Sequence, residues 1–217
     1  MAFVFDAYGT LFDVHGAIAR YRDRVGPDAD RLSDLWRSKQ LEYTWTLTLA
    51  GRYVDFWTLT ERALAFALAR FPRVDQTLKS DLLDAYLTLD PFPDAGATLH
   101  RLKAQGQKTA ILSNGTPRML DAALAASGFV ADVDAVLSVD AIRIYKPRPE
   151  VYRLATDALD TTADAVTFIS SNRWDVMGAR AFGFRVLWIN RAGVPEEYAD
   201  LPPSRVMTSL HELAARV

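Results

Sequence analysis

The first residue that could do chemistry is Asp6, which follows the apolar run 2–5 and precedes the turn-forming pair Gly9-Thr10. Ligands of open parallel α/β sheets bind beyond the carboxyl ends of the strands, so a carboxylate here could bind or attack a substrate. An Asp after a strand is also common as a plain turn or cap residue. Asp6 alone leaves both interpretations open.

A second candidate is the pair Ser113-Asn114, which follows the apolar run 108–112 and precedes a segment of helical character. A hydroxyl, an amide and the free N–H groups of a helix N-terminus together could bind an anion. An ordinary turn that ends in a helix cap would explain the same residues.

Two further polar motifs follow later strands. Lys146, in Tyr145-Lys146-Pro147, could neutralise a carboxylate, although most lysines lie exposed to solvent. Ser170, Asn172 and Asp175 come where the next strand gives way to a helix, and there they could equally cap that helix or favour its dipole. Four such motifs in order favour one shared site over four independent turns.

The elements that must position these residues are short apolar runs alternating with helical segments, the pattern of a parallel sheet covered on both faces. Five buried strands are expected, at Ala2–Phe5, Lys108–Leu112, Ala135–Val139, Val166–Ile169 and Arg185–Ile189. Helices are expected at Asp94–Gln105, Pro117–Ser127, Pro149–Leu159, Trp174–Phe182 and Ser209–Arg216.

Residues 14–91 have helical periodicity and no convincing strand, and they are too many and too apolar for a loop. We expect an all-helical cap here, inserted after the first strand over the carboxyl end of the sheet. Residues 1–13 and 92–217 would then form the α/β core, with Pro91-Phe92-Pro93 marking the return to it.

The composition narrows the class of protein. The 217 residues have a net charge of −2, which gives no reason to expect nucleic acid or an anionic membrane as a partner. With no Cys and three scattered His, no thiolate site and no histidine-based metal site are expected. The first residues do not resemble a signal peptide, and no apolar run could span a bilayer, so we expect a cytoplasmic protein.

Taken together, the four strand-end motifs resemble those of the haloacid dehalogenase (HAD) superfamily, over essentially the whole chain. The stretches 35–45 (LWRSKQLEYTW) and 6–13 (DAYGTLFD), and Tyr145-Lys146-Pro147 with Tyr152, look like the L-2-haloacid dehalogenase subgroup. The resemblance implies the HAD fold, a Rossmann-like parallel sheet core with an inserted helical cap.

Two departures distinguish the chain from the phosphatases of that superfamily. In the phosphatases, a second Asp two residues after the nucleophile protonates the leaving alkoxide. In this chain that position is Tyr8. Only one acid, Asp175, lies in residues 170–175, where phosphatases gather carboxylates for Mg²⁺. A departing halide requires neither group, so we expect no metal and no other cofactor.

The resemblance implies that Asp6 displaces halide from a 2-haloacid and forms an ester. Arg37 and Asn114 would receive the halide, although an Arg on an apolar helix face can also pack its stem and reach water. Ser113, with backbone N–H groups near Tyr8 and Gly9, would anchor the substrate carboxylate.

The remaining site residues would support the nucleophile and the second step. Thr10 would orient Asp6, Lys146 would keep it ionised, and Tyr152 would support this part of the site unless it is only a half-buried helix residue. Water would attack the ester with help from Ser170, Asn172 and Asp175, and either Asp175 or Lys146 could be the base. The apolar side chains that keep water from the halide would be Tyr8, Leu41, Phe56 and Trp174. For Leu41 and Phe56, ordinary core packing is the alternative role.

The expected activity is hydrolysis of short-chain L-2-haloacids to D-2-hydroxyacids, with a small 2-haloacid and water as partners. A metal-dependent phosphatase with degenerate motifs and a non-catalytic ligand-binding or interaction module are the alternatives, because a fold does not fix a function. A homodimer is expected from the family resemblance, and the cap aromatics Tyr43, Trp45, Tyr53 and Trp57 could contribute to its interface.

Overall fold

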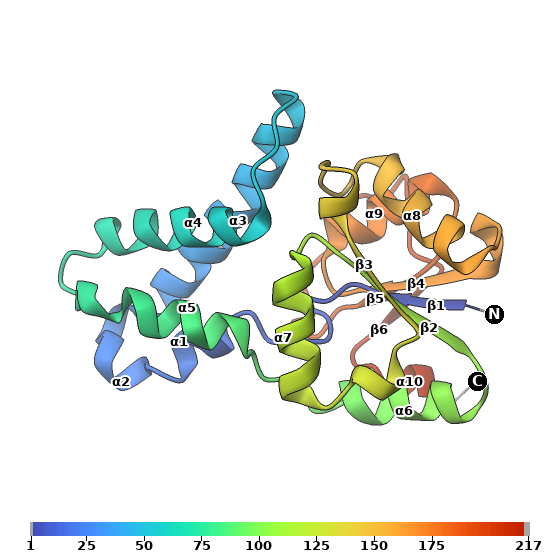
Figure 1. Cartoon of the computed structure of the whole chain (residues 1–217), viewed down its shortest axis with the longest axis horizontal. Helices are drawn as coiled ribbons and strands as arrows, with labels where there is room; N and C mark the ends of the chain where they lie inside the picture. The colour runs from blue at the N-terminus through green and yellow to red at the C-terminus, as the bar shows by residue number, and fades with distance from the viewer. Residues whose placement is uncertain (1, 215–217) are drawn as a thin grey trace.

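The structure is a computed structural model, and it describes residues 2–214. Its centre is a sheet of six parallel strands in the order β3-β2-β1-β4-β5-β6 (Figure 1). The strands are β1 (Ala2–Phe5), β2 (Lys108–Ser113), β3 (Ala135–Ser138), β4 (Val166–Ser170), β5 (Arg185–Ile189) and β6 (Arg205–Met207). The α/β class and the parallel sheet predicted from the sequence are therefore confirmed.

The middle of the sheet is buried because its strands are apolar on both faces. In the register of β1 with its neighbours, Phe5 lies opposite Ile111 of β2 and Ile169 of β4, and all three side chains are fully buried. Figure 1 shows α8 (Pro149–Leu159) and α9 (Arg173–Phe182) on one side of the sheet, and α6 (Ala95–Ala104) and α10 (His211–Ala214) on the other. The helix α7 (Pro117–Ser127) follows β2.

The expected elements differ from the observed ones mainly at their ends. Helices α7 and α8 have the predicted bounds, and Asp94 and Gln105 are the caps of α6 and lie outside it. The last helix begins at His211, later than predicted, and Arg216 lies outside the described residues. Strand β6 was not predicted, because its three residues include a half-exposed Val206 and an Arg, which give no buried apolar run.

The chain between β1 and α6 is helical, as expected for residues 14–91. It forms α1 (Gly16–Ala19), α2 (Arg22–Val25), α3 (Ala29–Leu49), α4 (Phe56–Arg70) and α5 (Lys79–Leu87), which lie together at one end of the molecule in Figure 1. The longest two, α3 and α4, pack against each other through buried Trp36, Leu59 and other apolar side chains. Whether this helical part folds as a separate cap remains a prediction.

The two chain segments that connect the helical part to the sheet run side by side. The N–H of Asp13 donates to the carbonyl of Asp90 (2.9 Å), and Phe12 forms an isolated bridge with Pro91. Next to them, the guanidinium of Arg191 lies over the ring of Phe92 and donates to the carbonyl of Thr10 (3.2 Å). Arg191 therefore links the returning segment at Phe92 to the turn that follows β1.

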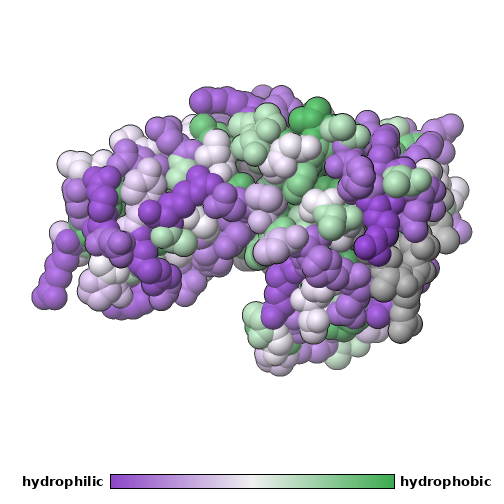
Figure 2. Space-filling view, turned by 90° about the horizontal axis from the view of Figure 1, so that it is seen from below, coloured by the Kyte–Doolittle hydropathy of each residue, from purple (hydrophilic) through white to green (hydrophobic). Residues whose placement is uncertain are grey.

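The surface is mixed in character. Figure 2 shows polar side chains over most of the face seen from below, with apolar groups between them. Within residues 2–214, no helix combines the length and apolarity needed to cross a bilayer.

Candidate active site

The turn after β1 presents Asp6 at the carboxyl end of the sheet. Asp6 follows the buried strand directly and is only 5% exposed. The turn requires a positive φ of 91° at Gly9, a conformation that L side chains rarely adopt. Gly9 therefore lets the chain reverse so that Thr10 returns to the Asp6 carboxylate.

The two oxygens of the Asp6 carboxylate have different partners. Oδ2 accepts hydrogen bonds from Asn172 Nδ2 (2.7 Å), Thr10 Oγ1 (3.0 Å) and, at a longer distance, Ser170 Oγ (3.5 Å). Oδ1 accepts from Lys146 Nζ alone among the hydrogen bonds of the described residues (3.0 Å). Oδ1 is therefore the less encumbered oxygen and the better placed to attack an electrophile.

Lys146 lies between two carboxylates in the interior. Its Nζ contacts Asp6 Oδ1 at 3.0 Å and Asp175 Oδ2 at 2.8 Å, and its side chain is fully buried. Burial lowers the pKa of Lys146, but the charges of Asp175 and Asp6 outweigh this effect and leave the pKa above its ordinary value. Lys146 is therefore an ammonium that holds both carboxylates.

Asp175 is a fully buried acid in the first turn of α9. Its Oδ1 accepts a hydrogen bond from the Tyr152 hydroxyl (2.8 Å), and its Oδ2 contacts Lys146. Burial raises the pKa of Asp175 to about 6, with Lys146 opposing this rise and Asp6 adding to it. A carboxyl with such a pKa can accept a proton near neutral pH.

Arg37 brings a second cation to the site from helix α3. Its Nη2 donates to the carbonyl of Tyr8 (3.1 Å) and to Asn172 Oδ1 (3.4 Å), and its Nη1 donates to Gln40 Oε1 (2.8 Å). In the described part of the chain, these acceptors are neutral and Arg37 forms no ion pair. Its charge is thus available to an anion.

Gln40 and Tyr86 belong to the site but were not recognised in the sequence. Gln40 is 1% exposed, and its Nε2 donates to Thr60 Oγ1 (2.7 Å) and to the Tyr86 hydroxyl (3.1 Å) while its Oε1 holds Arg37. The signal was present, because a polar residue three positions after Arg37 lies on the same helix face.

A small cavity, with about 220 Å³ of space between atoms and part of it open to solvent, is lined by the Asp6 carboxylate. Its lining comprises Asp6, Tyr8, Arg37, Leu41, Phe56, Ser113, Asn114, Asn172 and Trp174. The structure thus brings together every residue that the sequence assigned to substrate or halide binding. Thr10, Lys146, Tyr152, Ser170 and Asp175 stand behind this lining, in contact with Asp6 or with each other.

Ser113 and Asn114 reach the cavity from the end of β2. Asn114 Oδ1 accepts the N–H of Lys146 (3.2 Å), which leaves its amide NH₂ as a donor. Ser113 Oγ accepts the N–H of Gly115 (3.1 Å), so its proton is also available. Of the backbone N–H groups expected near Tyr8 and Gly9, that of Gly9 is already engaged, because it donates to the carbonyl of Phe12 (2.8 Å).

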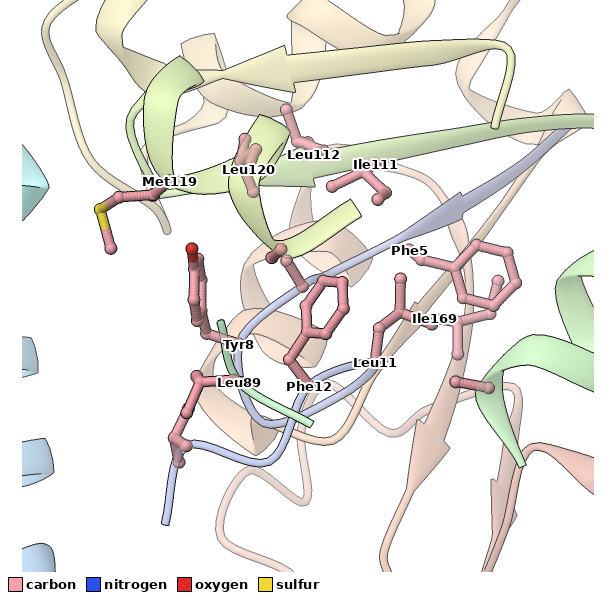
Figure 3. Close-up of a cluster of buried hydrophobic side chains, with 14 of the residues drawn as sticks. Phe5, Tyr8, Leu11, Phe12, Leu89, Ile111, Leu112, Met119, Leu120 and Ile169 are labelled. Carbon is pink, nitrogen blue, oxygen red and sulfur yellow. The ribbon is translucent and has the colours of Figure 1, made fainter. Parts of the chain in front are cut away.

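Tyr8 supplies an aromatic wall where a phosphatase would have an acid. Its ring stacks on Tyr86 with 5.7 Å between ring centroids, and Figure 3 shows its hydroxyl pointing toward the side where Met119 lies. Burial raises the pKa of Tyr8 well above its ordinary value, and the hydroxyl has no hydrogen-bond partner among residues 2–214. Tyr8 is therefore a neutral phenol and a poor proton donor to an alkoxide.

The donor set does not fit a divalent cation. No group of three or more His, Cys, Asp or Glu side chains that could hold a metal occurs among residues 2–214. Asp6 and Asp175, the two acids that meet in the site, both contact the ammonium of Lys146. A cation therefore already occupies the position between the two carboxylates that a metal ion would take.

Comparison with known proteins gives a consistent result. The model of the haloacid dehalogenase-like hydrolase family matches residues 1–183. The (S)-2-haloacid dehalogenase 1 of Pseudomonas sp. strain CBS-3 is 52% identical over 213 residues, which cover 98% of this chain and 94% of that protein. The (S)-2-haloacid dehalogenase 4A of Burkholderia cepacia is 50% identical over 98% of this chain and 92% of its own.

A solved structure extends the likeness to three dimensions. The L-2-haloacid dehalogenase of Xanthobacter autotrophicus with chloropropionic acid covalently bound superposes with a TM-score of 0.89 at 38% identity. The match covers 99% of this chain and 96% of that one.

Proposed function

The chain belongs to the (S)-2-haloacid dehalogenases, within the haloacid dehalogenase-like hydrolases, and we propose that it releases halide from short L-2-haloacids through an ester on Asp6. One observation carries the assignment to these residues. A buried carboxylate with one lightly bound oxygen faces the same small cavity as an arginine that has no ion pair among the described residues.

In the first step, Asp6 Oδ1 attacks C2 of the substrate from the side opposite the halogen. The new C–O bond forms as the carbon–halogen bond breaks, and the bonding pair leaves with the halide. Negative charge moves from Asp6 to the leaving group, so Arg37 and the Asn114 amide stabilise the transition state where that charge develops. Configuration at C2 inverts in this step.

The substrate carboxylate needs an anchor that does not compete with the halide. Ser113, at the end of β2, has a free proton and lines the cavity beside Tyr8. We assign the carboxylate to Ser113 and the backbone N–H of Tyr8. The alkyl group of the substrate then faces Leu41, Phe56 and Trp174.

In the second step, water attacks Cγ of the Asp6 ester. Oδ2 becomes the ester carbonyl oxygen, and the donors Asn172, Thr10 and Ser170 already point at it, so they stabilise the oxyanion of the tetrahedral intermediate. The bond between Cγ and the bridging oxygen breaks, and the D-2-hydroxyacid leaves while Asp6 keeps an oxygen from water.

Asp175 is the base that we assign to this water. Its pKa of about 6 suits proton transfer near neutral pH, whereas Lys146 has a raised pKa and stays protonated. The proton taken by Asp175 is returned to the departing hydroxyacid oxygen, and the second proton of the water leaves the Asp6 carboxyl for solvent, which restores the carboxylate. Tyr152 holds Asp175 in place through its hydroxyl (2.8 Å).

The experiment that tests this function measures chloride release from separate L- and D-2-chloropropionate, with EDTA present and with Asp6→Asn as the control. Release from the L enantiomer alone, lost in Asp6→Asn, is expected. No release from either enantiomer, or release by Asp6→Asn at the wild-type rate, would contradict the proposal. Turnover of a phosphate ester with Mg²⁺ would then favour the phosphatase.

The homodimer, the separate cap over residues 14–91 and the cytoplasmic location also remain proposals. Partly buried aromatics of the helical part, Tyr43 and Tyr53, support a protein interface there. Light scattering on the purified chain tests the dimer, and a single mass near 24 kDa would contradict it.

A further inference from the structure

A second, larger cavity shares one lining residue, Trp174, with the reaction cavity. It holds about 790 Å³ of space between atoms, part of it open to solvent, against about 220 Å³ for the reaction cavity. Its lining is mainly apolar and includes Trp45, Leu49, Met177 and Tyr198. Trp174 lines both spaces, so its indole is a shared wall.

The Trp174 indole contacts an aromatic ring of the helical part. Trp45, near the end of α3, meets Trp174 in the first turn of α9 edge to face, with 5.5 Å between ring centroids. Both indoles are partly exposed. Arg37, Leu41 and Trp45 are spaced four residues apart on α3, so one helix face runs from the reaction cavity to the second cavity.

The orientation of substrate in the proposed function directs its tail at this wall. With the carboxylate at Ser113 and the halogen at Arg37, the alkyl group faces apolar side chains, of which Trp174 alone also lines the larger cavity. Among these apolar side chains, Trp174 is therefore the one that separates a longer tail from the larger cavity.

We propose that the apolar cavity beyond Trp174 is a latent subsite for the alkyl tail of longer 2-haloalkanoic acids, and that Trp45, by holding Trp174 in place, sets the upper chain length of the substrate. This inference rests on the proposed function, because it takes the orientation of the haloacid from it. Trp45→Ala gives the Trp174 indole room to move toward α3 and joins the two spaces. Each methylene that enters the apolar cavity then improves binding by about fourfold.

The test compares kcat/KM for L-2-bromohexanoate with kcat/KM for L-2-bromopropionate, so that the halide stays the same. The ratio is expected to rise by at least about tenfold in Trp45→Ala. Met177→Phe in the Trp45→Ala background refills the cavity and is expected to restore the low wild-type ratio. Trp57→Ala is the matched control, because it removes an indole that lies near Arg118 and does not line the second cavity. It is expected to leave the ratio unchanged.

The outcomes separate this inference from the proposed function. If the wild-type protein does not act on L-2-bromopropionate, the proposed function fails. If it does act, and the ratio in a folded Trp45→Ala protein is unchanged or falls, the subsite is overturned and the dehalogenase activity stands.

Should Trp45→Ala not fold, Trp45→Phe serves as the second variant, because it removes part of the indole. It is expected to raise the ratio by a smaller factor, and an unchanged ratio overturns the subsite too. A second copy of the chain seated on this cavity would show as a ratio that depends on protein concentration, and that result also overturns it.

Discussion

Gln40 Oε1 accepts a 2.8 Å hydrogen bond from Nη1 of Arg37, one turn earlier on the same helix. Gln40 is itself fixed by its amide NH₂, which donates to Thr60 and Tyr86. A neutral, buried network therefore positions the Arg37 guanidinium, which we propose to face the leaving group, and Arg37 forms no ion pair among the described residues.

This relationship predicts the effect of Gln40→Met, which keeps the side-chain volume and removes the acceptor. We expect kcat/KM to fall by about tenfold, since a hydrogen bond to a charged group is lost and Arg37 is less well aimed. The loss should be larger for a chloroacid than for the bromoacid, because chloride leaves less readily. A control, Gln76→Met, alters a glutamine that bonds only loop and helix carbonyls. Equal losses with both halides would indicate a structural effect alone.

Thr10→Val tests the assignment of Oδ2 as the ester carbonyl oxygen. The variant removes one of the donors to Oδ2, so hydrolysis of the ester should slow by about 10²–10³-fold, with less effect on halide release. A burst of halide followed by slow turnover, and a mass increase on the peptide that contains Asp6, are the expected observations. Thr10→Ser keeps the hydroxyl and should behave nearly as the wild type. If Thr10→Val slowed the burst of halide itself, Thr10 would act in the first step, and the assignment of Oδ2 would be contradicted.

The pH dependence of turnover follows from Asp175. Its pKa of about 6 means that the carboxylate takes up a proton as pH falls through this value, after which it cannot accept one from water. With ester hydrolysis limiting, kcat should be high above about pH 6 and should fall below it. Tyr152 lowers the pKa of Asp175 by donating to the carboxylate, so Tyr152→Phe should move this acid limb to higher pH. A limb that moves to lower pH would contradict the role of Asp175.

Gly178→Ala should destabilise the packing of α9 against Pro147 and Tyr152. A Cβ at Gly178 would lie 2.5 Å from Cβ of Pro147 and closer still to the Tyr152 hydroxyl, so α9 could not pack against either without displacement. We expect the free energy of unfolding to fall by about 1–3 kcal/mol and activity to fall with it. Gly16→Ala is the matched control, because its Cβ would meet its nearest neighbours at 3.9 and 4.0 Å. Thermal unfolding of both variants provides the measurement, and equal stability would contradict the tight packing at α9.

Much of this architecture could be predicted from the sequence, because buried parallel strands are short apolar runs and the polar residues after them must meet at one edge. Asp6, Ser113, Lys146 and Asp175 were found in this way. The supporting network could not be found so directly. Gln40 and Tyr86 are 46 positions apart and meet only when α3 packs against α5, and Arg191 reaches Asp94 and Thr10 across the crossing between the helical part and the sheet. Local periodicity does not encode such distant polar pairs.

The most direct test of the account follows oxygen in a single turnover. With enzyme in excess over L-2-chloropropionate in H₂¹⁸O, water adds to the Asp6 ester, so the first product should carry unlabelled oxygen from Asp6 and the label should appear in the peptide that contains Asp6. After many turnovers the product should carry ¹⁸O. Label in the hydroxyacid of the first turnover, with none on Asp6, would mean that water attacks the substrate carbon directly and that Asp6 is not the nucleophile.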